Sequence, residues 1–224
     1  NIMIKHYLKV AFRNLMKYKT QSLVSIIGLA VGFTCFALSV LWIRYEMTYD
    51  TFHKGAERIY MVRAHYTDIP EHISNSTPYP LAAYLQEKMP EIEAKATTSI
   101  HQNVKIRMEN DEYEVVMAAA DSAFMNFFHI QLLKGTVNFL KENNPEIAVT
   151  EEFAKKLFGS EDDALGKEME VNGRSRQIGA IVSGWSRHSN IPYSVLVAAR
   201  HSPRWKSGPE QLFIRVRAGM DMDT

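Results

Sequence analysis

The stretch QSLVSIIGLAVGFTCFALSVLWI, residues 21–43, contains no charged side chain. As an α-helix, the part from Leu23 to Ile43 would extend about 30 Å, which is the thickness of the hydrocarbon core of a bilayer. A signal peptide would have a shorter apolar run and a cleavage site with small residues, whereas this run is followed by RYEM. We therefore predict a retained transmembrane helix over residues 21–45.

Charge is distributed unevenly on the two sides of this stretch. Residues 1–45 contain six of the 26 Lys and Arg residues and none of the 25 Asp and Glu residues, so the remainder holds 20 basic and 25 acidic side chains. Five basic residues precede the apolar run and three follow it within about fifteen residues, a bias that predicts a cytoplasmic amino terminus. The remainder shows no basic face, and we expect no nucleic-acid partner.

The segment before the apolar stretch combines positive charge with helical spacing. Four basic residues recur at intervals of four, so they would share one stripe of a helix beside an apolar face. We predict that residues 1–20 form a cytoplasmic amphipathic helix that lies at the membrane interface, with its basic side toward anionic lipid headgroups. A basic flank that only sets topology is the alternative. The predicted membrane-interface residues are Lys5, Lys9, Arg13, Lys17, Lys19 and Trp42.

Two further features lie inside the apolar stretch. Gly28 and Gly32 form a G-x-x-x-G pair, which lets a second helix approach closely. Because glycine is common in such helices, the pair is only a candidate for helix packing. Cys35 is the single cysteine of the chain, so the remainder has no disulfides and must be stabilised by its core.

Residues 46–224 contain signals for helices and strands without a βαβ rhythm, which predicts an α+β domain. Helix signals are a start at Pro80 with a stop at Pro90, a cap at Asp121, and a cap at Thr150 with an end at Gly159. Strand signals lie at residues 58–66, 104–120 (a hairpin with its turn near Asn110 and Asp111), 146–150, 169–182 (a hairpin turning at Asn172 and Gly173) and 211–219.

Motifs for catalysis or metal binding do not stand out. GSEDDALGK, residues 159–167, has six residues between its glycines instead of the four of a phosphate-binding loop, and Glu168 stands where Ser or Thr should hold magnesium. The eight histidines lack the paired spacing of a metal site, and Ser183 lies outside a nucleophile-elbow motif. We predict no catalytic, cofactor-binding or metal site in this chain, and no enzyme activity.

Five blocks of the sequence resemble FtsX-like ABC transporter permeases with a MacB-like periplasmic core domain, of the type found in Bacteroidetes. In one loop the family usually has Pro–Asn–Ser–His, whereas this chain has RHSNIPYS (187–194), which keeps Ser189 but not the histidine. The blocks are AFRNLMKYKTQSLVSIIGLAVG (11–32), YDTFHKGAERIY (49–60), TPYPLAAYLQEKMPEIEA (77–94), ADSAFMNFFHIQLLKG (120–135) and IAVTEEFAKKLFGSEDDALGK (147–167).

The resemblance implies a permease subunit in the bacterial inner membrane whose ATP is bound and hydrolysed by a separate ABC ATPase subunit. Residues 46–224 would be the periplasmic core domain, in which a subdomain inserted at about 101–199 interrupts a porter-like subdomain. The implied partners also include a second permease in a homodimer or heterodimer, membrane lipids and a periplasmic adaptor.

The resemblance also suggests that the chain is an amino-terminal portion which ends inside a subdomain. Residues 58–100 are then expected to be less ordered than the inserted part, or to be covered by another chain. A membrane-anchored sensor or binding module without transport activity is the alternative function. An anchored enzyme would require a convergent polar cluster that the sequence does not show, and the sequence does not identify a substrate.

Overall fold

The computed structural model describes residues 2–50, 53, 55–65, 73–108, 111–185, 189, 191–205 and 210–220. The chain divides into two compact units, residues 1–49 and residues 50–224. Each unit is described by itself.

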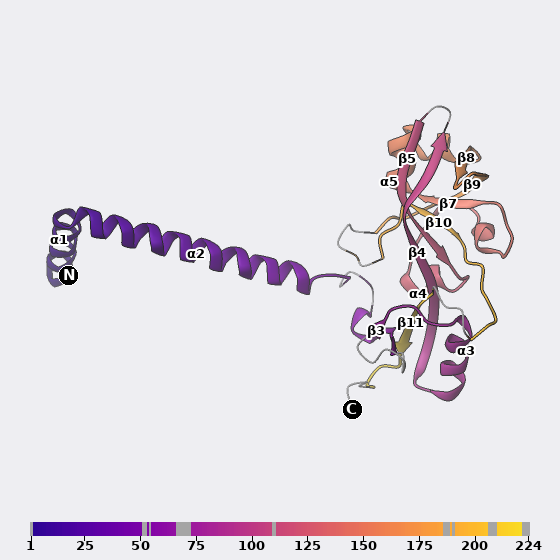
Figure 1. Cartoon of the computed structure of the whole chain (residues 1–224), viewed down its shortest axis with the longest axis horizontal. Coiled ribbons are helices and arrows are strands. Elements are labelled where there is room, and N and C mark those ends of the chain that lie inside the picture. Colours follow the sequence, from indigo (N-terminus) through magenta and orange to yellow (C-terminus); the bar gives the residue numbers. More distant parts are fainter. Residues whose placement is uncertain are drawn as a thin grey trace. The chain divides into compact units, whose positions relative to one another are not determined.

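The first unit consists of two helices, α1 (Ile2–Lys17) and α2 (Lys19–Met47), which are separated at Tyr18 (Figure 1). The 29 residues of α2 are long and apolar enough to cross a membrane, and none of them is buried within the protein. The hydroxyls of Thr34 and Ser39 donate to backbone carbonyls four residues earlier, at 2.8 and 2.9 Å. These bonds satisfy polar groups that would otherwise be costly in lipid.

The second unit is built on one nine-stranded mixed sheet. The strand order is β1-β11-β4-β5-β10-β7-β9-β6, and β8 pairs with both β4 and β9. All pairs are antiparallel except β5 with β10 and β7 with β9. The strands are β1 (Ile59–Val62), β4 (Ile92–Met108), β5 (Asp111–Ala120), β6 (Leu132–Gly135), β7 (Ile147–Thr150), β8 (Glu168–Val171), β9 (Arg174–Val182), β10 (Val195–Ala198) and β11 (Gln211–Val216); β2 (Ala64–His65) and β3 (Ile73–Ser74) pair separately.

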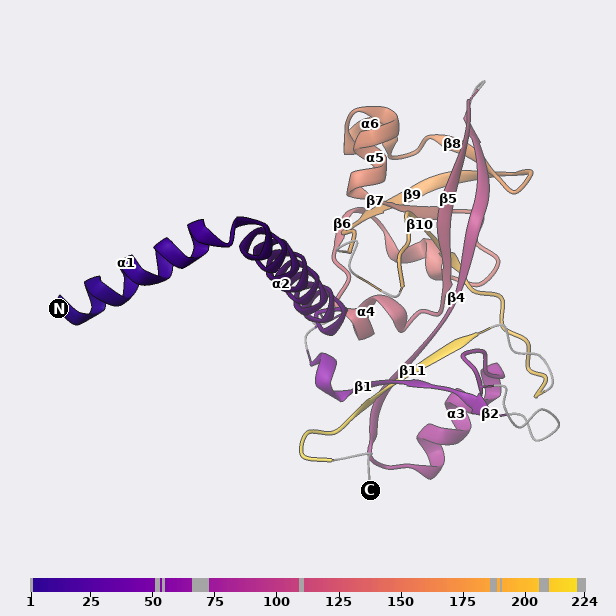
Figure 2. The same cartoon turned by 60° about the vertical axis from the view of Figure 1, so that its left-hand side comes forward.

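Strand β4 connects the two ends of this unit (Figure 2). Its first half pairs with β11, and its second half pairs with β5 and β8. The register shifts between His101 and Val104, which marks a bulge where the strand can bend. Because one continuous strand contributes to both ends, a change at one end can reach the other through the backbone.

Short helices cover the sheet: α3 (Tyr79–Lys88), α4 (Phe124–Phe128), α5 (Glu151–Phe158), α6 (Glu161–Ala164), and the 3₁₀ turns η1 (Ala56–Arg58) and η2 (Val137–Leu140). Helix α3 begins with Pro80 in its first turn and ends before Pro90. The hydroxyl of Thr150 accepts a hydrogen bond from the Phe153 amide at the start of α5, and Gly159 ends that helix with φ 83°. These boundaries follow the predicted caps.

Three clusters of buried apolar residues form the core. The first lies around α4 and the middle of the sheet, and the second lies between α5, β7, β9 and the second half of β4. The third cluster has four buried members, which are Ala82, Ile92, Leu212 and Ile214.

The predicted α+β class is confirmed, with several local differences. The strand predicted at 58–66 is divided into β1 and β2, and Tyr66 lies outside the described residues, as does Asn110 of the predicted first turn. Asp121 is not the cap itself: Ala123 occupies that position, and Asp121 Oδ1 accepts from the Ala123 amide at 3.0 Å. The sequence also did not predict β6, β10, the first half of β4 or the parallel β7–β9 crossover. The boundaries of an inserted part at 101–199 stay a prediction.

Candidate functional site

Specific polar contacts gather where the second unit begins, at Asp50 and His53. Ser189 Oγ donates to Asp50 Oδ1 at 2.5 Å and accepts a hydrogen bond from the Ile191 amide at 3.1 Å. His53 Nε2 lies 3.8 Å from the same carboxylate oxygen. Asp50 has φ 54°, a left-handed conformation that Asp tolerates better than most residues. We refer to Asp50, His53 and Ser189 as the anchor.

Aromatic side chains surround His53. Its ring centroid lies 5.1 Å from that of Phe128 and 4.8 Å from that of Trp185, and only 8% of the residue is exposed. Burial lowers the pKa of His53 and outweighs the opposing effect of Asp50, while the nearby His129 lowers it further. The anchor therefore favours a neutral imidazole that packs as an aromatic ring.

The anchor is not a nucleophilic triad, although it contains Ser, His and Asp. In such a triad the histidine accepts the proton of the hydroxyl and the carboxylate orients the histidine. Here the Ser189 hydroxyl donates directly to the carboxylate, and Ser189 is 6% exposed. The arrangement holds the chain in place and has no exposed attacking group.

Two further contacts tie neighbouring segments to the same region. Arg58 Nη1 lies 2.8 Å from Glu93 Oε2 and 3.1 Å from the Val216 carbonyl, so η1 is joined to β4 and β11. Arg215 donates through Nη2 to the Phe127 carbonyl, and its Cζ lies 4.7 Å from the centroid of the Phe127 ring. Strand β11 is thereby joined to α4.

A third contact joins the segment just before α4 to β4. Asp121 Oδ2 accepts hydrogen bonds from the amide and the hydroxyl of Thr97, at 2.8 and 2.9 Å. Together with the anchor, these contacts connect the segment that follows α2 to three elements of the sheet and its helices.

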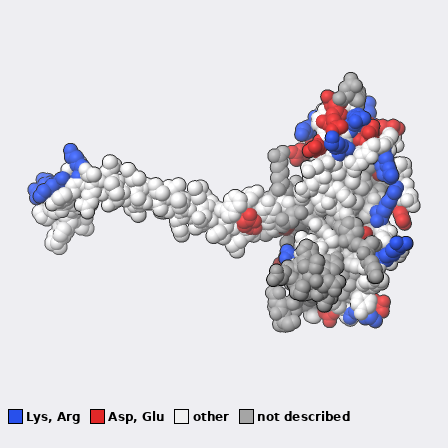
Figure 3. All heavy atoms as spheres, viewed as in Figure 1, with Lys and Arg blue, Asp and Glu red and all other residues white. Residues whose placement is uncertain are grey.

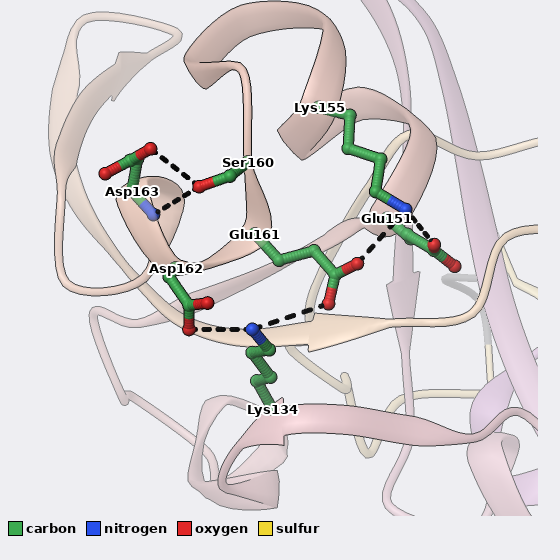
Figure 4. Close-up of polar contacts among 7 residues, drawn as sticks. All are labelled: Lys134, Glu151, Lys155, Ser160, Glu161, Asp162 and Asp163. Carbon is green, nitrogen blue, oxygen red and sulfur yellow. Dashed lines mark hydrogen bonds and ion pairs between the residues drawn. The ribbon is translucent and has the colours of Figure 1, made fainter.

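The stretch at 159–167 forms a network of ion pairs (Figure 4). Lys134 Nζ lies 2.7 Å from Asp162 Oδ1 and 3.8 Å from Glu161 Oε2, while Lys155 Nζ contacts Glu151 and lies 3.2 Å from Glu161 Oε1. The hydrogen bond to Asp162 raises the pKa of Lys134. A nucleotide phosphate would meet carboxylates here, which is the opposite of the chemistry of a phosphate-binding loop.

The predicted membrane-interface residues lie on the first unit, where all six are exposed. Lys5, Lys9, Arg13 and Lys17 lie on α1, while Lys19 and Trp42 lie on α2. The space-filling view shows basic side chains gathered at α1 and an α2 that is uncharged along most of its length (Figure 3). Their contact with lipid stays a prediction.

The candidate packing pair lies on the exposed surface of α2. Apart from the adjacent residues and the nearby backbone of α2 itself, a Cβ added at Gly28 or Gly32 would meet no atom of the described residues within 4 Å. This open space can admit a second helix, but the role of the pair stays a prediction.

Sequence reasoning missed the anchor as a unit. No motif in the sequence sets His53 or Arg215 apart. Arg58 counts only toward the charge bias after the apolar run, and Ser189 stands out only in the loop that departs from the family pattern. The available signal was the spacing of Asp50 and His53 directly after an apolar helix. That signal could not identify Ser189 as the partner, because 139 positions separate it from Asp50.

Comparison with protein families identifies the family to which this domain belongs. Residues 22–224 match the model of the MacB-like periplasmic core domain, and the chain belongs to that family. The domain that follows α2 is therefore an extracytoplasmic domain of a kind found in ABC transporter permeases. Helix α2 is the candidate membrane-spanning helix. A comparison with curated proteins finds no match.

Solved structures share the fold at low sequence identity. A crystallised domain assigned to a permease protein from Porphyromonas gingivalis has a TM-score of 0.64 and 23% identity, covering 75% of this chain and 79% of that one. The periplasmic region of MacB from Actinobacillus actinomycetemcomitans has a TM-score of 0.54 and 12% identity, covering 75% and 78%. The extracellular domain of the noncanonic ABC-type transporter YknZ from Gram-positive bacteria has a TM-score of 0.53 and 12% identity, covering 72% and 83%.

Proposed function

We propose that this chain belongs to a permease subunit in which the anchor transmits movement of α2 to the periplasmic domain. Only Thr48 and Tyr49 separate the last residue of α2 from Asp50, whose carboxylate bonds the buried Ser189. This short connection into a buried contact carries the proposal. A long flexible linker would absorb a displacement, whereas two residues that lead directly into a fixed side chain pass it on.

In this proposal α2 crosses the bacterial inner membrane with the amino terminus in the cytoplasm. The basic face of α1 lies against anionic headgroups, and a separate ABC ATPase subunit supplies the energy. The permease acts as a homodimer or heterodimer, with a periplasmic adaptor as a further partner. The charge bias around the apolar helix supports this orientation, and the family membership supports the ATPase partner.

Membrane topology gives the first test. A reporter that is active only in the periplasm should be active when fused after Tyr66 and inactive when fused before Lys5. Activity at the amino-terminal fusion would overturn the orientation.

Energy coupling gives the second test. The purified chain should not hydrolyse ATP, because the stretch at 159–167 presents carboxylates instead of a phosphate cradle. The permease should co-purify with an ABC ATPase subunit. Turnover by the purified chain that is unchanged by Lys167→Ala and persists after removal of contaminating ATPases would contradict the proposal.

A further inference from the structure

A cavity of about 390 Å³ opens beside the anchor, between the β1–β11 end of the sheet and α4. Phe128, Ile191 and Phe213 line it and belong to the core, with exposed fractions of 5%, 4% and 7%. Ala56 of η1 and Ile59 and Met61 of β1 complete the apolar part of its lining. A cavity of this size and composition is typical of a small-molecule site.

The strand geometry gives this cavity a direction. Residues 59, 61 and 63 alternate along the chain, so they lie on one face of β1 and its continuation. Met61 pairs with Phe213 across the antiparallel strands, which makes a continuous apolar floor. From Ile59 to Arg63 the floor extends about 13 Å, since each strand residue adds about 3.3 Å.

The two ends of the floor differ in charge. Arg63, Asn75 and Gln211 line one end, and the pairing of Val62 with Leu212 brings Arg63 opposite Gln211. Among the described residues, Arg63 has neither a hydrogen-bond partner nor an ion-pair partner for its guanidinium. Asp50 of the anchor lines the other end. A carboxylate on a ligand would thus be attracted to Arg63 and repelled from Asp50.

We propose that this cavity binds an amphiphile with an apolar chain and one terminal carboxylate. The chain lies over Met61 and Phe213, and the carboxylate is held by Arg63 with the amides of Asn75 and Gln211. Because the occupant would touch both β1 and the anchor, its role in transport rests on the proposed function. Binding itself requires no ATPase, so the two proposals can fail separately.

The test uses the full chain in lipid nanodiscs, without an ATPase, and a decanoic acid that carries a photoactivatable diazirine. Mass spectrometry should find the label on peptides that contain β1 and β11. Unlabelled decanoate should compete roughly tenfold better than octanoate, because two more methylenes are buried, and better than decanol, which lacks the carboxylate. Arg63→Gln should weaken competition about tenfold.

Arg217→Gln is the matched control, because it removes the same charge from an exposed position just past the other end of β11. Met61→Trp should fill the cavity and abolish labelling of β11. If Met61→Trp fails to fold, Arg63→Gln still decides, because Arg63 is exposed and its loss leaves the core intact.

Three results would overturn the proposal. One is labelling confined to residues 19–47, which would mean partition into the bilayer only. Another is an equal effect of the two arginine variants, and the third is competition by decanol as strong as that by decanoate. Loss of labelling when anionic phospholipid replaces zwitterionic lipid in the nanodisc would assign the site to a lipid phosphate and would also overturn it.

Discussion

The two ends of strand β4 lie in cores of very different depth. Val104 and Ile106, near its end, belong to a cluster of 13 buried apolar residues between α5, β7 and β9. Ile92, at its start, belongs to a cluster of four, against which α3 packs. A deep core opens only when the whole domain unfolds, whereas a thin one can open locally.

His53 of the anchor packs against Phe128, which belongs to the first cluster, around α4 and the middle of the sheet. We expect the thin core of α3, β1 and β11 to move relative to the deep core. The following variants test this difference, starting with the largest effect.

Shortening a buried side chain in the deep core around Ile106 should lower the free energy of unfolding far more than shortening one in the thin core around Ile92. Ile106 is fully buried, and Ile106→Ala should lower the free energy of unfolding by about 2–5 kcal/mol. Leu85 packs against the thin core while partly exposed, and Leu85→Ala should cost about 1 kcal/mol. Urea unfolding of the two variants measures both effects. Equal losses would mean that the two cores are equally essential.

Removal of the anchor hydroxyl should have the next largest effect. Ser189→Ala leaves the Asp50 carboxylate without its 2.5 Å hydrogen bond, which should cost about 1–3 kcal/mol. The control is Ser175→Ala, which removes a 2.9 Å hydrogen bond from an exposed serine to Glu168. The control should change stability very little. If the two variants lose the same amount, the anchor contributes no more than a surface contact.

The anchor should also make stability depend on pH. Burial depresses the pKa of His53 in the folded state below its unfolded value of about 6.5, so the unfolded state binds the proton more tightly. The contribution of His53 to the free energy of unfolding is thus fully present above about pH 6.5. It falls as the pH falls, by at most about 1.4 kcal/mol per pH unit.

His53→Phe keeps an aromatic ring and removes the titration, so the difference between wild type and variant isolates this residue. The free energy of unfolding should fall less steeply for the variant than for the wild type as the pH is lowered from about 7 to about 5. His101→Phe is the control, because it makes the same replacement at an exposed position on β4. A slope that His53→Phe does not alter would show that the imidazole is not responsible.

The smallest effect is expected at the ion pairs of Figure 4. Glu161→Gln removes the carboxylate shared by Lys134 and Lys155 but leaves Asp162 and Glu151 in place. The midpoint of thermal unfolding should fall slightly at low salt and not at all at high salt, since solvent screens these charges. A large loss that salt does not reduce would mean that this network is part of the deep core.

Local chemistry explains which elements the sequence could predict. The start of α3, the Thr150 cap and the Asn172–Gly173 turn depend on neighbouring residues. The structure places the cap and the turn as predicted, and α3 begins at Tyr79, one residue before the predicted Pro80. The first half of β4 was not predicted, because AKATTS mixes buried alanine, threonine and serine without an alternating pattern. Its burial comes from pairing with β11, more than 100 positions away.

The candidate site was harder to predict for the same reason. The membrane segment and its basic flank follow from composition alone, so both could be named by residue. The anchor depends on one hydrogen bond between Asp50 and Ser189 and on aromatic rings from three separate segments. Neither the spacing nor the periodicity of residues in the sequence predicts which distant residues come into contact.

The central claim is that the anchor carries movement from α2 into the domain. It is tested most directly by hydrogen exchange on the complex with the ABC ATPase subunit that the proposed function requires, with and without ATP. We predict that ATP changes the protection of α3, β1 and β11 and leaves β7 and β9 unchanged. A Gly-Ser-Gly-Ser insertion after Thr48 should abolish this change, whereas the same insertion after the exposed Asn143 should not. An ATP-dependent change that survives the insertion after Thr48 would contradict the account.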